Sequence, residues 1–144
     1  MTIRLDLNAE IPIYQQLRDQ LLIGIADGRL RPGESLPSVR QLGADLGINL
    51  HTVNKVYNLL RQEGFLTTHR QRGVVVSEAE SRLETAAYRQ QLEASLLPIL
   101  AEARCRDVPL EALVAIVTRQ YRSFSHASHA TPPAGDSGKG SDAP

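Results

Sequence analysis

Residues 36–76 read LPSVRQLGADLGINLHTVNKVYNLLRQEGFLTTHRQRGVVV, and they carry signals for two helices and a small hairpin. Ser38 stands where a helix N-cap is expected, and Gln41 three residues later predicts a capping box. Gly47 ends this short helix, because glycine readily takes the left-handed conformation that follows a helix. A second helix begins almost at once, so the stretch predicts a helix-turn-helix.

The second helix is expected from about Leu50 to Glu63, with Asn49 as its cap. One face should pack into the core, because apolar residues recur there at helical spacing: Val53, Val56, Tyr57 and Leu60. The opposite face and the first turn carry hydrogen-bonding side chains of the kind that read base edges: His51, Thr52, Asn54, Lys55 and Asn58.

A hairpin follows Gly64. Residues 65–68 and 74–76 are its expected strands, and the turn His69-Arg70-Gln71-Arg72-Gly73 places two arginines near the tip. Two helices, a sharp turn and a basic wing predict a winged helix-turn-helix that reads duplex DNA.

The charge distribution agrees with this interpretation. The 144-residue chain has 16 basic and 16 acidic residues, so its formal net charge is zero. Basic residues nevertheless outnumber acidic ones between Ser38 and Val76. This stretch contains only two acidic residues, Asp45 and Glu63, and the basic residues Arg40, Lys55, Arg61, Arg70 and Arg72. Arg61, near a helix end, is interpreted as structural, and His69 as an ordinary loop residue.

Composition also excludes several classes of protein. The chain has no apolar run long enough to span a membrane, and its first residues lack the basic region and apolar stretch of a secretory signal, so neither feature is expected. The single cysteine, Cys105, cannot form an internal disulfide and suits a reducing cytoplasm. No cluster has zinc-ligand spacing, so neither a metal nor a cofactor is expected.

The segments before residue 36 should complete the first domain, residues 1–76. Residues 1–10 look like an extended arm that packs on the body through Ile3, Leu5 and Leu7. A helix is expected from Pro12 to about Asp27, with its apolar stripe at Ile13, Leu17, Leu21 and Ile25. Pro32-Gly33 predicts a type II turn.

Residues 77–124 predict a helical dimerisation segment. One amphipathic helix is expected from roughly Glu80 to Arg104, kinked or interrupted at Pro98, and a second from near Pro109. Two such helices cannot bury both stripes alone. They need the first domain, a second subunit or both, and pairing with a second subunit is the more economical expectation. The residues assigned to that pairing are Leu92, Leu96, Ile99, Leu110, Leu113, Val117 and Tyr121. Residues 125–144 have no periodicity and predict a disordered tail.

The motifs resemble the DNA-binding domain of GntR-type bacterial transcription regulators. The resemblance rests on Leu30 to Leu42, on Leu46-Gly47-Ile48-Asn49 and on Glu63-Gly64-Phe65-Leu66. The opening Leu5-Asp6-Leu7 and Pro12-Ile13-Tyr14-Gln15-Gln16-Leu17 resemble the YtrA-type subfamily in particular. The implied fold is mainly α with a small β wing, an N-terminal winged helix-turn-helix followed by a two-helix dimerisation segment.

The resemblance also implies a set of DNA-contacting residues. Arg40 contacts DNA from the first helix of the motif, and the recognition helix contributes Asn49, His51, Thr52, Asn54 and Lys55. The wing contributes Arg70, Gln71, Arg72 and Gly73. Two residues depart from the family pattern: Gln71 replaces a usual glycine at the wing, and Gly43 replaces a usual alanine where the helices cross.

The expected function is a sequence-specific transcriptional regulator, a homodimeric repressor at a pseudo-palindromic operator of double-stranded DNA. A winged-helix adaptor that binds protein without operator binding is the alternative. An enzyme is not expected, because no nucleophile–base pair is visible and the chain is far shorter than a GntR protein fused to an aminotransferase-like domain. A small-molecule effector between the C-terminal helices stays open, although no convergent polar cluster marks its site.

Overall fold

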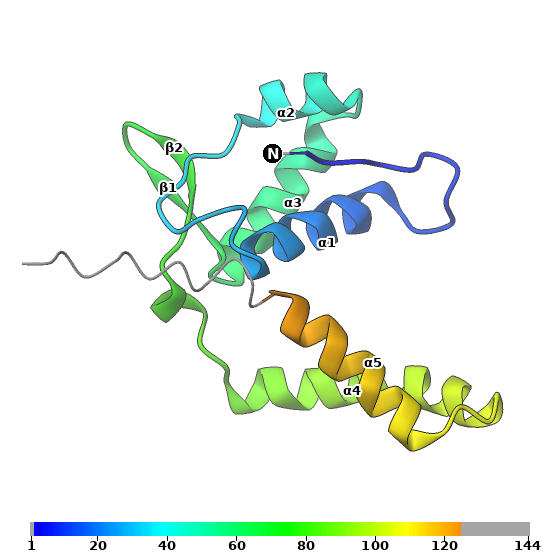
Figure 1. The fold of residues 1–144 in the computed structure, drawn as a ribbon. Helices are drawn as coiled ribbons and strands as arrows, with labels where there is room; N and C mark the ends of the chain where they lie inside the picture. The colour runs from blue at the N-terminus through cyan, green and yellow to red at the C-terminus, as the bar shows by residue number, and fades with distance from the viewer. Residues whose placement is uncertain (1, 125–144) are drawn as a thin grey trace, which may run out of the picture.

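The computed structural model describes residues 2–124, which form five α-helices, one two-stranded antiparallel sheet and a short 3-10 helix. Figure 1 shows a winged domain built from the first three helices and the sheet, with the last two helices below it. The elements are α1 (Ile13–Ala26), α2 (Val39–Leu46), α3 (Leu50–Gln62), β1 (Leu66–His69), β2 (Gly73–Val76), η1 (Ala79–Arg82), α4 (Ala86–Cys105) and α5 (Leu110–Ser123). The predicted fold class is confirmed, while the predicted tail, residues 125–144, lies outside the described residues.

The core of the winged domain lies between α1 and α3. Leu17 and Leu21 of α1 are fully buried, as the predicted stripe requires, and they join a cluster with residues of α3 and the sheet. After α1, the Glu34 N–H donates to the Arg31 carbonyl at 2.9 Å and closes the predicted turn at Pro32-Gly33. This turn directs the chain toward α2.

The start of α2 differs in one contact from the predicted capping box. The Ser38 hydroxyl accepts a hydrogen bond from the Gln41 N–H at 3.1 Å, so the cap itself is confirmed. The Gln41 side chain was expected to reach back to the backbone of Ser38. It donates instead to the Asp45 carboxylate at 2.7 Å, one turn further along α2. The prediction of a reciprocal box was therefore wrong, because Asp45 offers a charged acceptor at i+4 spacing.

The turn between α2 and α3 holds the two helices close together. Gly47 ends α2 in the left-handed conformation with a φ of 67°, and Asn49 caps α3, as predicted. A Cβ atom added at Gly43 would lie 3.2 Å from the Ile48 carbonyl oxygen, a tight contact. The absence of a side chain at Gly43 therefore leaves room for the backbone of α2 to lie close to the backbone of the turn that enters α3.

The buried face of α3 consists of the four residues predicted from helical spacing. Val53, Val56, Tyr57 and Leu60 are all fully buried. The Tyr57 hydroxyl donates to the Pro37 carbonyl at 2.8 Å, so a core residue of α3 holds the segment that leads into α2. This bond satisfies a polar group that would otherwise be buried without a partner.

Burial raises the pKa of the Tyr57 phenol well above its ordinary value, which is about 10 in a solvated chain. The unfolded chain therefore ionises at a pH where the folded protein still holds the neutral phenol. This contribution to stability is fully present below about pH 10 and is lost as the pH rises further. We expect the stability advantage of the natural protein over Tyr57→Phe to shrink by up to about 1.4 kcal/mol per pH unit above pH 10. Urea denaturation of both proteins at pH 8, 10 and 11 measures this gap, and a constant gap would contradict the assignment.

The N-terminal arm lies along α1 and is held by two glutamines one helical turn apart. The Gln20 side chain accepts from the Arg4 N–H at 2.9 Å and donates to the Arg4 carbonyl. Gln16 makes the same pair of bonds with Asp6, at 2.9 and 3.0 Å. Ile3 and Leu5 pack against the core as predicted. Leu7 does not, because the chain turns away from α1 and leaves this side chain 70% exposed.

The wing contains one more pairing than the sequence analysis predicted. β1 and β2 pair antiparallel, with Leu66 opposite Val76 and His69 opposite Gly73. The segment before α2 also pairs with β2, because the Leu36 N–H donates to the Val74 carbonyl at 2.8 Å and the Val76 N–H to the Glu34 carbonyl at 2.9 Å. This pairing ties the base of the wing to the chain that enters the helix-turn-helix.

The first C-terminal helix begins later than predicted and continues through the proline, whereas the second, α5, begins at Leu110 after Pro109, as predicted. The expected helix from Glu80 is replaced by η1 over its first residues, and α4 starts only at Ala86, where the Thr85 side chain caps it by accepting from the Tyr88 N–H at 3.0 Å. Pro98 lies inside α4 and does not end it. Neither α4 nor α5 packs extensively on α1, α2 or α3 in the described chain. Among the described residues, no helix has the length and apolar character needed to cross a membrane.

Candidate nucleic-acid interface

The first half of α3 presents polar side chains on the side away from the core. His51 and Asn54 are exposed, and Thr52 is half-buried. The Asn49 side-chain oxygen accepts from the His51 N–H at 2.9 Å, so this oxygen caps the helix. Its amide nitrogen is the part of Asn49 that can still donate to a ligand. The cap fixes the first turn of α3 and with it the direction of the neighbouring side chains.

Lys55 is held against α1. Its ammonium lies 4.2 Å from the centroid of the Tyr14 ring, within the range of a cation–π interaction. The contact does not bury the charge, because Lys55 is exposed. It restricts where a long, flexible side chain can reach, so α1 helps to position a charge on the recognition helix. This role of Tyr14 was not predicted from the sequence.

Arg40 extends this polar surface onto α2. It lies in the first turn of the helix and is exposed. The Ser38 cap fixes the start of α2, and with it the position from which the Arg40 side chain extends into solvent. Arg40 is therefore placed where a cation can meet a phosphate group.

The wing tip is basic, but its two arginines lie differently. Arg72 folds back and donates from its guanidinium to the Gly33 carbonyl at 3.1 Å, which ties the tip to the turn after α1. In the described part of the chain Arg70 makes neither a hydrogen bond nor an ion pair. Gln71 is exposed and does not have a positive φ, so the backbone does not need the glycine usual at this position. Gly73 supplies the positive φ, 72°, that closes the turn.

Arg61 fixes the wing relative to the recognition helix. Its guanidinium donates to the Thr68 hydroxyl of β1 and to the Asn58 side chain on α3, both at 2.9 Å. The prediction that Arg61 is structural agrees with these contacts, although the predicted reason was the helix dipole. Helical spacing alone could not reveal the contact with Thr68, because it joins two elements.

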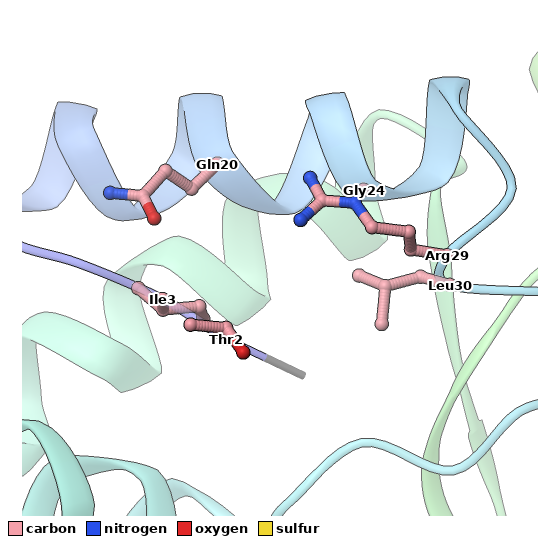
Figure 2. A pocket seen from close by; sticks show the side chains of 6 residues that line it. All are labelled: Thr2, Ile3, Gln20, Gly24, Arg29 and Leu30. Carbon is pink, nitrogen blue, oxygen red and sulfur yellow. The ribbon is translucent and has the colours of Figure 1, made fainter.

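A pocket lies away from these groups. It is a small pocket of about 30 Å³, enclosed by the N-terminal arm, α1 and the residues that follow α1. Figure 2 shows Gln20 and Gly24 of α1 along one side of it, with Ile3 and Leu30 nearby.

A short helix, a glycine turn, a recognition helix with an exposed polar first half and a basic hairpin define a winged helix-turn-helix. In proteins of this architecture the second helix enters the major groove of duplex DNA, while the surrounding groups contact the backbone. The fold and the site therefore define the class of protein as a DNA-binding regulator.

Comparisons with known proteins agree with this class. Residues 13–76 match the model of the family described as bacterial regulatory proteins, gntR family. The HTH-type transcriptional repressor YtrA of Bacillus subtilis is 32% identical over 111 residues, covering 77% of this chain and 85% of that protein. A solved structure of YtrA from Sulfolobus acidocaldarius, a GntR-family transcription factor, is 41% identical with a TM-score of 0.56, covering 69% of this chain and 97% of that one.

One further structure shows the fold alone. A protein of Listeria monocytogenes described as a transcriptional antiterminator has a TM-score of 0.78 at 18% identity, covering 86% of this chain and 92% of that one. The chain belongs to the GntR family of transcriptional regulators, and its similarity to the two YtrA proteins confirms the predicted YtrA-like subfamily.

Proposed function

We propose that the protein is a homodimeric repressor that binds a pseudo-palindromic operator through two winged domains. Each α3 would enter the major groove of one half-site, and α4 and α5 would join the two subunits. The observation that supports the dimer most strongly is the exposed apolar surface of the C-terminal helices. Soluble monomers rarely leave large contiguous apolar patches in water, so such a patch marks an interaction surface.

The apolar surface of α5 has the spacing of a helix-packing seam. Leu110, Val114, Val117 and Tyr121 are 70%, 55%, 59% and 75% exposed. Their separations of four, three and four residues put them on one face of the helix. This face, which we call the α5 seam, has the pattern of residues that pack against another helix.

α4 contributes a second exposed surface. No residue of this helix is buried among the described side chains, and the predicted pairing residues Leu92, Leu96 and Ile99 are 43%, 39% and 61% exposed. Leu113 fits the proposed interface less well than predicted, because it is already half-buried within the subunit. Val114 is the more exposed neighbour and replaces it in the proposed seam.

Repression is proposed from the relative. The Bacillus subtilis protein is described as a transcriptional repressor, and the likeness extends over 77% of this chain, beyond the winged domain. A regulator of this kind blocks transcription where its operator overlaps a promoter. We further propose that it acts in the cytoplasm and has no catalytic activity, in line with its membership of a regulator family.

The DNA contacts are proposed residue by residue. Asn54 and His51 would reach base edges from α3, with Asn49 and Thr52 contacting the backbone near the helix start. Lys55, Arg40 and Arg70 would neutralise phosphates. Gln71, Arg72 and Gly73 would line the wing where it follows the groove. The exposure of most of these side chains beside a fixed helix start supports this assignment.

Arg40→Ala is expected to weaken operator binding by about 10-fold, because one charge-assisted phosphate contact is lost. The slope of log affinity against log salt concentration should fall by about 1, since one fewer counterion is released. Fluorescence anisotropy titrations at several salt concentrations measure both quantities.

Arg119→Ala is the matched control, because Arg119 is an exposed arginine on α5, outside the winged domain. It should leave the affinity and the slope unchanged. Natural affinity and an unchanged slope in Arg40→Ala would remove this residue from the DNA-binding surface. Salt-independent binding of DNA by the natural protein would favour the adaptor alternative.

A further inference from the structure

The wing turn is organised by a histidine side chain. His69 is the last residue of β1, and its Nδ1 atom accepts from the backbone N–H groups of Gln71 at 3.2 Å and Arg72 at 3.3 Å. Aspartate and asparagine commonly form this pattern at turns, where their side-chain oxygen accepts from the backbone two or three residues later. The His69 imidazole therefore accepts the backbone hydrogen bonds that an asparagine side chain accepts in other turns.

The residues that His69 restrains are those that carry the charge of the wing. Arg70, Gln71 and Arg72 form the connection between the paired residues His69 and Gly73. A hairpin connection of three residues, closed by a glycine with positive φ, leaves backbone N–H groups without partners in the ladder. His69 satisfies two of them, and the bond from Arg72 to the Gly33 carbonyl holds the other side of the turn.

We propose that His69 is a positioning residue for DNA binding, whose neutral imidazole holds the wing turn in the shape that presents Arg70 to the duplex. An acceptor at Nδ1 requires that the ring proton lie on Nε2. The inference rests on the proposed binding of DNA, and it assigns His69 a role through the backbone and not through its own contact with a phosphate. A wing ordered before binding loses less conformational freedom when the complex forms.

The test compares His69→Ala with His69→Asn in the full chain. Alanine removes the acceptor, whereas asparagine restores an acceptor that reaches the same two N–H groups. His69→Ala is expected to weaken DNA binding by about 5-fold with an unchanged salt slope, because no cation is removed. His69→Asn should bind within about 2-fold of the natural protein, and Arg70→Ala should lower the salt slope by about 1.

Two measurements on the free protein test the same contacts without DNA. Amide hydrogen exchange at Gln71 and Arg72 should become faster in His69→Ala and stay slow in His69→Asn. Nitrogen-15 spectra of the imidazole should show the proton on Nε2. These readouts separate an effect on the wing from any change in operator recognition.

Each contrary result has a distinct meaning. Natural affinity in His69→Ala, alongside tight binding by the natural protein, would overturn this inference and leave the proposed function intact. A loss in both variants with a lower salt slope would also overturn it, because His69 would then contact a phosphate directly. If the natural protein bound no DNA while the exchange pattern held, the proposed function would fail and the role in DNA binding with it.

Discussion

The double substitution Val114→Glu with Val117→Glu is expected to produce monomers that bind a complete operator about 100- to 10,000-fold more weakly than the natural protein. Both valines lie in the α5 seam and are more than half exposed in the single subunit, so the substitutions should not unfold it. In the dimer they would bury two carboxylates against an apolar partner, which is strongly unfavourable.

The loss in affinity follows from linkage of two binding events. When one winged domain of a dimer is bound, the other is held near its half-site at a high effective concentration. A monomer lacks this advantage and binds each half-site separately. Sedimentation velocity gives the oligomeric state, and anisotropy on operators with one or two half-sites gives the affinities.

Arg119→Glu is the control for charge. It changes the net charge by the same two units as the double substitution, but residue 119 lies on the side of α5 opposite the seam. This variant should stay dimeric and retain most of its affinity for DNA. A double variant that still sedimented as a dimer would show that the subunits pair through another surface.

Leu17→Ala is expected to lower the free energy of unfolding by about 2–5 kcal/mol. Leu17 is fully buried between α1 and α3, and truncating it leaves a cavity that the surrounding side chains cannot fill completely. Small domains have total stabilities of about 5–15 kcal/mol, so this single change should remove a large part of the stability.

Leu7→Ala provides a matched comparison. It removes the same atoms from a side chain that is 70% exposed on the arm, and its effect should be within about 0.5 kcal/mol of zero. Urea denaturation followed by circular dichroism measures both variants. Equal stability of Leu17→Ala and Leu7→Ala would contradict the assignment of Leu17 to the core.

Features set by local sequence were predictable. The Ser38 and Asn49 caps depend on side chains within three residues of the backbone groups they satisfy, and the periodic apolar residues of α3 gave its buried face directly. The predictions that proved wrong required knowledge of competing partners. The Gln41 side chain donates to the Asp45 carboxylate and does not accept from the Ser38 N–H, and Leu7 could not reach the core because the arm turns away from α1.

The contacts that position the side chains of the candidate site were harder to predict, because they join segments that are far apart in the sequence. Tyr14 of α1 contacts Lys55 of α3, Arg72 of the wing donates to Gly33, which lies 39 residues earlier in the chain, and Arg61 bridges α3 and β1. No local pattern encodes such pairs. The contacts of His69 are local, yet the sequence did not predict them, because a histidine in place of asparagine gives no familiar turn signal.

Selection of bound duplexes from a random-sequence library, using the full chain at low salt, tests the central claim most directly. We expect an enriched inverted repeat whose half-sites are centred about 10 base pairs or a multiple of that apart, since two symmetric recognition helices must enter the major groove on the same side of the duplex. Recovery of no shared motif, or of one unrepeated half-site, would contradict the claim that this chain reads its operator as a dimer.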